Sequence, residues 1–263
     1  MLDRERVCLA PRVRSLRSLW AWLALIVFVL VPREARADGE VWIWTENRIP
    51  IVRTDTPGFP RLDWRLITDF RFNQRAGGLH QAFFRTGPAF YATDWLFMAV
   101  NGVVYADRQP DGRFLQEGRL ELEPNLFGRF GDFTFNDRNR FESRWREGNN
   151  RWRYRNQLRI NYAPKGAKWI PFVWDEILVD LSGTGFHQNR FDVGIARMLT
   201  ETIRLDVAYM LRSREDQGKW TNDHIFNLYF YFDVPPKAAP PPPALPMQQP
   251  PPAPMLPPAP GNE

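Results

Sequence analysis

The chain has 263 residues, a single cysteine (Cys8) and no long apolar run after residue 37. Cys8 precedes the apolar run of the N-terminal region instead of following it, so it is not a lipidation site. Beyond residue 37 the chain cannot form a disulfide bond, and no stretch is apolar enough to cross a membrane as a helix. These absences argue against a disulfide-rich secreted domain and against a helical membrane protein.

Serine and histidine are also scarce, which weakens hydrolase and metal-site hypotheses. After residue 37 they are limited to Ser143, Ser182, Ser213, His80, His187 and His224. The histidines share no spacing typical of metal ligands, so we expect no metal site. Ser182 and His187 share a predicted loop, and they are the candidate residues of an alternative function, an outer-membrane lipid-modifying hydrolase. The glycine pairs of the chain are typical of turns and cradle no phosphate, so we expect no cofactor.

Residues 1–37 are predicted to be a cleaved secretory signal peptide. Basic residues from Arg4 to Arg17 precede an apolar run from Leu19 to Val31, and Ala35-Arg36-Ala37 provides an Ala-x-Ala cleavage site. These are the three parts of such a signal. The alternative is an uncleaved anchor helix, for which the run falls short of the ~20 residues that a span needs.

The charge balance argues against nucleic acid as a partner. The chain has 35 Lys+Arg and 30 Asp+Glu, and seven of these arginines and three of these acids lie in residues 1–37. The remaining 28 basic and 27 acidic residues nearly cancel, so the pI of about 9.6 belongs mainly to the predicted signal. Nucleic-acid binding normally requires a basic excess that this part of the chain lacks.

A period of two in the stretch 151–162 predicts a β-strand that crosses a membrane. One parity carries Trp152, Tyr154, Leu158, Ile160 and Tyr162, and the other carries mainly arginines. Successive side chains of a strand point to opposite faces, and a tilted strand needs ~9–11 residues to span a bilayer. The pattern therefore predicts a barrel strand with its apolar face towards lipid and its arginines enclosed.

Similar alternating segments follow one another from residue 41 to residue 233. They predict an all-β fold, an antiparallel up-and-down transmembrane β-barrel of about 10–12 strands over residues 38–234. We count about eleven segments, but because bacterial barrels have even strand numbers, we slightly favour twelve. Connections near 106–115, 181–188 and 213–222 are expected to be longer and polar. A soluble periplasmic lipid-binding β-barrel is the alternative, although its polar face would carry more Lys, Thr and Ser.

Charged residues of alternating sign occupy the predicted enclosed face. Neighbouring strands lie ~5 Å apart, so arginines and carboxylates can pair across them, and the planar guanidinium suits such pairing. The expected residues of this Arg/Asp/Glu lattice are Arg119, Glu121, Glu123, Arg138, Arg140, Glu142, Arg153, Arg155, Arg159, Arg204 and Asp206. The lattice either fills the barrel and neutralises buried charge, or it lines a channel that attracts anions.

Residues 235–263 contain more than half of the 24 prolines. Proline lacks a backbone donor, so we expect a disordered periplasmic tail, with no specific ligand or with peptidoglycan or a periplasmic protein as partner.

Several short motifs resemble a bacterial family catalogued as domain of unknown function 2490, regarded as outer-membrane β-barrel proteins. The resemblance rests on stretches such as Trp42-Ile43-Trp44-Thr45-Glu46, Arg138-Asn139-Arg140-Phe141-Glu142 and Trp174-Asp175-Glu176, and it covers roughly residues 40–233. It implies no catalytic residues. The expected function is non-enzymatic, either structural or the passage of a small solute or anion across a bacterial outer membrane. The expected partners are outer-membrane lipid and, during biogenesis, the barrel-assembly machinery.

Overall fold

The computed structural model describes residues 39–52, 61–73, 77–146 and 148–234, which form eleven β-strands. The strands are β1 (Gly39–Val52), β2 (Arg61–Asn73), β3 (Gly78–Tyr91), β4 (Leu96–Arg108), β5 (Phe114–Phe130), β6 (Phe133–Arg146), β7 (Asn149–Tyr162), β8 (Trp169–Asp180), β9 (Gly185–Met198), β10 (Ile203–Asp216) and β11 (Lys219–Asp233). None of the described residues belongs to a helix that could cross a membrane. The predicted signal (1–37) and tail (235–263) lie outside the described residues.

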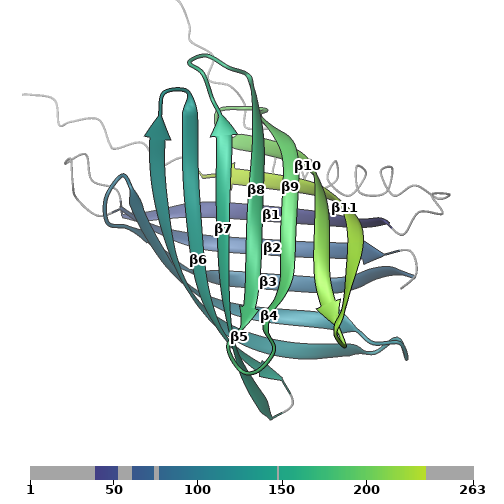
Figure 1. Ribbon diagram of the computed structural model, residues 1–263. Helices are drawn as coiled ribbons and strands as arrows, with labels where there is room; N and C mark the ends of the chain where they lie inside the picture. Colours follow the sequence, from purple (N-terminus) through teal and green to yellow (C-terminus); the bar gives the residue numbers. More distant parts are fainter. Residues whose placement is uncertain (1–38, 53–60, 74–76, 147, 235–263) are drawn as a thin grey trace, which may run out of the picture.

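The eleven strands close into one barrel, in which each strand pairs with its neighbours in the sequence (Figure 1). All these neighbours are antiparallel, whereas β1 and β11, which close the barrel, are parallel. The predicted all-β barrel of 10–12 strands is therefore confirmed, and the preference for twelve, an even number, was wrong. In a meander with an odd number of strands the first and last strands run the same way, and they can still pair.

The first segment, β1, is a full member of the wall. β1 pairs with β2 from Glu40 to Val52 and with β11 from Gly39 to Arg48. Residues 53–60, between β1 and β2, lie outside the described residues.

The connections expected to be long are mostly strand. β4 continues to Arg108 and β5 begins at Phe114, and only Gln217 and Gly218 separate β10 from β11. Both turn residues have a positive φ, 49° and 80°, as a two-residue hairpin turn with the right twist requires. The sequence analysis expected loops there because these segments are polar. Strands that extend beyond the apolar band of a barrel wall carry polar residues on both faces, so their composition resembles that of a loop.

Inward and outward side chains differ sharply in burial. On β2, Asp63, Arg65 and Asp69 are buried, while Trp64 and Phe70, which alternate with them, are exposed. The same alternation follows β4 and β5, where outward apolar side chains such as Leu120 are about half exposed. The barrel therefore encloses most of its charged side chains and presents apolar ones on its outside.

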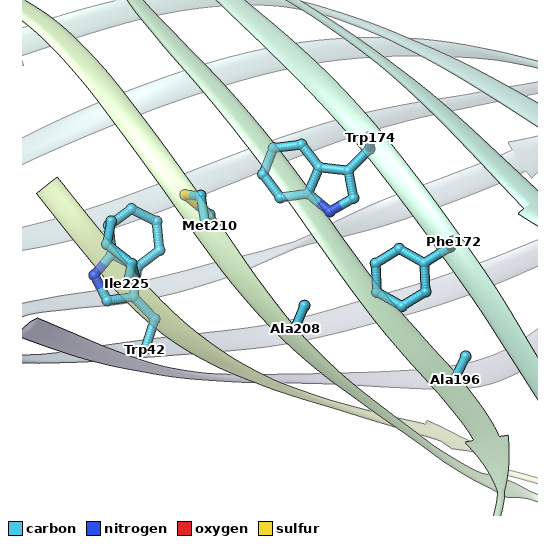
Figure 2. Packing of buried hydrophobic residues seen from close by; sticks show 7 residues of the cluster. All are labelled: Trp42, Phe172, Trp174, Ala196, Ala208, Met210 and Ile225. Atoms are coloured by element: carbon cyan, nitrogen blue, oxygen red, sulfur yellow. The ribbon is translucent and has the colours of Figure 1, made fainter. Parts of the chain in front are cut away.

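One side of the interior is apolar, contrary to the expectation that the apolar parity faces outward throughout. Trp42 of β1 packs with side chains from β8 to β11 (Figure 2). The cluster consists of Trp42, Phe172, Trp174, Ala196, Ala208, Met210 and Ile225. The barrel interior thus has an apolar side around Trp42 and a charged side, although β1, β8 and β9 contribute residues to both.

Candidate functional site

The barrel interior holds a cavity of about 1070 Å³, lined by side chains from all eleven strands. Cavities that bind small molecules typically measure ~300–1,000 Å³, so this one has room for a ligand. Much of its charged lining belongs to two networks of glutamates and arginines, each spread over several strands.

The first network joins β1, β2, β3, β5 and β6. It consists of Glu46, Glu121 and Glu123 with Arg48, Arg65, Arg85 and Arg140. Arg65 links two carboxylates, since its Nε lies 2.9 Å from Glu46 Oε1 and its Nη1 lies 3.0 Å from Glu123 Oε1. Such sharing neutralises charges that would be costly to bury alone.

The second network joins β5 to β9. It consists of Glu117, Glu142 and Glu176 with Arg119, Arg138, Arg144, Arg153, Arg155 and Arg190. Glu176 accepts hydrogen bonds from three of these arginines, at 2.8 Å from Arg138, 2.7 Å from Arg155 and 3.1 Å from Arg190. Planar guanidinium groups allow several to surround one carboxylate.

All eleven residues expected to form the lattice lie inside the barrel and take part in ion pairs. Eight of them belong to the two networks, and the other three form a separate group, in which Asp206 lies 2.8 Å from Arg159 and 3.0 Å from Arg204. The register is not the simple alternation of signs that the sequence suggested. Arg119 lies opposite Arg144, and Arg140 lies opposite Arg155, so several ion pairs run diagonally between strands.

The sequence analysis missed about half of the networks. The missed members are Glu46, Arg48, Arg65, Arg85, Glu117, Arg144, Glu176 and Arg190. Each lies on the enclosed parity of its strand, but on β1 and β8 that parity also carries Trp42 and Trp174, so the alternation of apolar and polar residues does not show which parity is enclosed there. Nor could the alternation show which residues meet across the interior, because Arg65 and Glu123 are 58 positions apart.

Arginines outnumber carboxylates in the two networks. Ten arginines share six glutamates, and all ten line the cavity, whereas only Glu46, Glu123 and Glu176 among the glutamates do so. The surface of the cavity is therefore rich in guanidinium N–H donors. Uncompensated positive charge in an enclosed space favours an anion as counter-charge.

Aromatic rings fix some of these guanidinium groups in place. The guanidinium of Arg71 lies 3.6 Å from the ring centre of Trp42 and 4.3 Å from that of Phe83, so it is held between two rings. Arg190 and Arg212 lie 5.2 and 5.5 Å from the same Trp42 ring. Three cations thus meet at the border between the apolar and charged sides of the interior.

The residues of the hydrolase alternative are not joined by a hydrogen bond in the described part of the chain. Ser182 Oγ accepts a hydrogen bond of 2.7 Å from the backbone N–H of Trp152. His187 Nδ1 lies 3.2 Å from the carbonyl oxygen of Gly185. Among the described residues, no three His, Cys, Asp or Glu side chains gather as a metal site would require.

Comparison with protein families gives a match. A family model described as a protein of unknown function (DUF2490) matches residues 43–223, which include most of the barrel wall. Comparison with curated proteins gives no match.

Proposed function

The chain belongs to the family of unknown function DUF2490, and from its geometry we propose an integral outer-membrane β-barrel that admits small anionic solutes to its arginine-lined interior. The observation that carries the proposal is the excess of arginines over glutamates on the cavity surface. Guanidinium groups bind carboxylate and phosphate oxygens through paired N–H donors, so this surface suits such anions.

The outside of the barrel supports the membrane part of the proposal. Outward side chains along the middle of β4 and β5, such as Val100 and Leu122, are apolar and exposed. Exposed aromatic side chains occupy both ends of β7, with Trp152 at one end and Tyr162 at the other. Apolar bands bounded by aromatic residues are typical of barrels that span a bilayer. The predicted export signal, residues 1–37, fits this location, which assembly machinery would reach from the periplasm.

Fractionation tests the membrane location. We expect the protein to remain in the outer-membrane fraction after carbonate extraction and to show heat-modifiable migration on a denaturing gel. Release by carbonate without detergent would contradict an integral barrel and would favour the soluble lipid-binding alternative.

Conductance tests the passage of anions. Purified protein is placed in planar bilayers under a KCl gradient. Its reversal potential should shift from zero towards the equilibrium potential of chloride. Replacing Arg144 and Arg153 with Gln should weaken that preference, because both line the cavity. Arg113→Gln is the matched control, since Arg113 lies exposed in the β4–β5 connection. The absence of conductance would contradict passage.

The proposed role is non-enzymatic, and the hydrolase alternative has its own test. The protein should leave lipid A and phospholipid acyl chains unchanged, and the Ser182→Ala variant should behave like the wild type. Loss of an acyl-chain modification in that variant would favour the hydrolase.

A further inference from the structure

A polar patch interrupts the apolar outside of the barrel on strands β6 to β9. We call it the mid-wall patch, and it consists of Asp137, Asn139, Asn156, Asp175 and Asn189. These residues alternate along their strands with inward side chains that line the cavity, such as Arg138, Arg155 and Glu176, so they point outward.

The patch lies midway between the two aromatic ends of the wall. On β6, Asn139 is six residues from Phe133 and six residues from Trp145, and both of these aromatic side chains are exposed. On β7, Asn156 is four residues from Trp152 and six from Tyr162. If the aromatic ends mark the membrane interfaces, as in the proposed function on which this inference rests, the patch lies near the middle of the bilayer.

Both carboxylates of the patch are bound only by neutral donors. Asn156 Nδ2 donates to Asp137 Oδ1 at 2.5 Å and Asn139 Nδ2 donates to Asp137 Oδ2 at 3.2 Å. Asn189 Nδ2 donates to both oxygens of Asp175, at 2.9 and 3.1 Å. No salt bridge joins either aspartate to a basic side chain in the part of the chain that the structure describes.

Inside the barrel, the carboxylates of the two networks are paired with arginines. The two outward aspartates of the mid-wall patch differ from them, since their hydrogen-bond donors are neutral. Charged groups at mid-membrane depth are unfavourable against lipid and usually meet a partner. Asp175 is exposed, and Leu158, which lies between Asp137 and Asp175 in the register, is exposed too. The patch is therefore accessible and lacks a cation.

We infer that the mid-wall patch binds a membrane-embedded segment of a different protein that presents a lysine or arginine at the same depth. Charge complementarity selects this occupant, because two carboxylates in a low-dielectric surrounding attract a cation strongly. The three asparagine amides offer further hydrogen bonds to its backbone or side chains.

A second copy of the chain fits the patch less well. A two-fold axis along the membrane normal would turn β6 of one copy towards β8 of the other, so Asp137 would approach Asp175 of the second copy. Facing carboxylates repel each other. Outward side chains at mid-wall on β4 and β5, such as Val100 and Leu122, provide no cation either.

Photo-crosslinking in cells of the native host tests the inference with the full-length protein. A photoreactive p-benzoylphenylalanine at position 158 should give an adduct with one other protein. The same group at position 122, whose leucine is similarly exposed, 42% against 43%, should give none. The Asp137→Asn/Asp175→Asn variant should reduce the adduct at least tenfold while retaining heat-modifiable migration. If that variant does not fold, Asp175→Asn alone replaces it.

A charge exchange then decides whether the partner has the stated chemistry. Asp175→Lys should abolish the adduct, and replacing the partner's basic residue with glutamate should restore it. An adduct of twice the chain mass, adducts with lipid alone, equal adducts from positions 158 and 122, or a captured protein without a basic residue at that depth would each overturn the inference. Release of the protein by carbonate would instead contradict the proposed membrane location.

Discussion

Glu121 and Glu142 lie directly opposite each other on β5 and β6, and both side chains are fully buried. Like charges in this position repel each other, so the arrangement depends on arginines that approach from other strands. Arg85 of β3 lies 2.6 Å from Glu121, and Arg155 of β7 lies 3.1 Å from Glu142. The first of these ion pairs joins β3 to β5, which are not neighbours in the wall, and the second joins the adjacent strands β6 and β7.

Arg155→Ala should destabilise the barrel strongly. Arg155 binds Glu142 and both oxygens of Glu176, so its loss leaves two buried carboxylates short of a partner. Breaking a buried ion pair on one side costs ~3–5 kcal/mol. Urea unfolding in lipid vesicles, followed by tryptophan fluorescence, measures the change in unfolding free energy.

The control for this prediction is the exposed pair of Arg113 and Asp111, which lie 2.7 Å apart. Arg113→Ala should leave the unfolding free energy nearly unchanged, because both side chains of this pair are exposed to solvent. Adding Glu142→Gln to Arg155→Ala should not recover the loss, because Glu142 also binds Arg153, which would then lose its partner. Equal effects of Arg155→Ala and Arg113→Ala would contradict a structural role of the networks.

Gly87→Ala should disturb the β3–β4 contact. A Cβ at Gly87 would lie 1.9 Å from the backbone oxygen of Val100, a position that backbone atoms cannot vacate cheaply. Overpacking of this kind costs at least ~1–3 kcal/mol. Gly102→Ala, on β4, is the matched control, since no atom lies within 4 Å of its Cβ. The folded fraction on a non-boiled gel should fall for the first variant only, and an unchanged fraction would show that the strands can separate.

Arg71→Lys should destabilise the barrel, because Arg71 lies where the apolar and charged sides of the interior meet. A lysine keeps the charge but cannot stack its ammonium as a plane between Trp42 and Phe83. We expect a loss of ~1–2 kcal/mol, the size of a desolvated cation–π contact. Arg197→Lys, whose guanidinium lies 4.4 Å from the exposed ring of Trp169, should cost ~0.5 kcal/mol or less. Chemical denaturation compares them, and a larger loss at position 197 would refute the stacking argument.

The two ends of the barrel sequence should be accessible from opposite sides of the membrane. β1 starts at Gly39 and β11 ends at Asp233, and because these strands are parallel, the chain enters at one rim and leaves at the other. Epitope tags inserted before Gly39 and after Glu263 can be probed with antibodies on intact and on permeabilised cells. Exactly one tag should react on intact cells. Reaction of both, or of neither until permeabilisation, would contradict the parallel closure.

The sequence by itself determined which residues are enclosed on the strands whose two parities differ clearly, such as β7. A period of two places Arg153 and Arg155 on one face and Trp152 and Tyr154 on the other, whatever the neighbouring strands are. That is why the all-β barrel and the enclosed position of the predicted lattice residues could be derived without a structure.

The tertiary structure decided the rest, because register and closure depend on strands far apart in the chain. A shift of one residue between strands would change every partner in the networks, and no local pattern specifies that Arg65 meets Glu123. The odd strand number, the apolar side of the interior around Trp42 and the mid-wall patch around Asn156 likewise appear only when eleven strands are placed side by side.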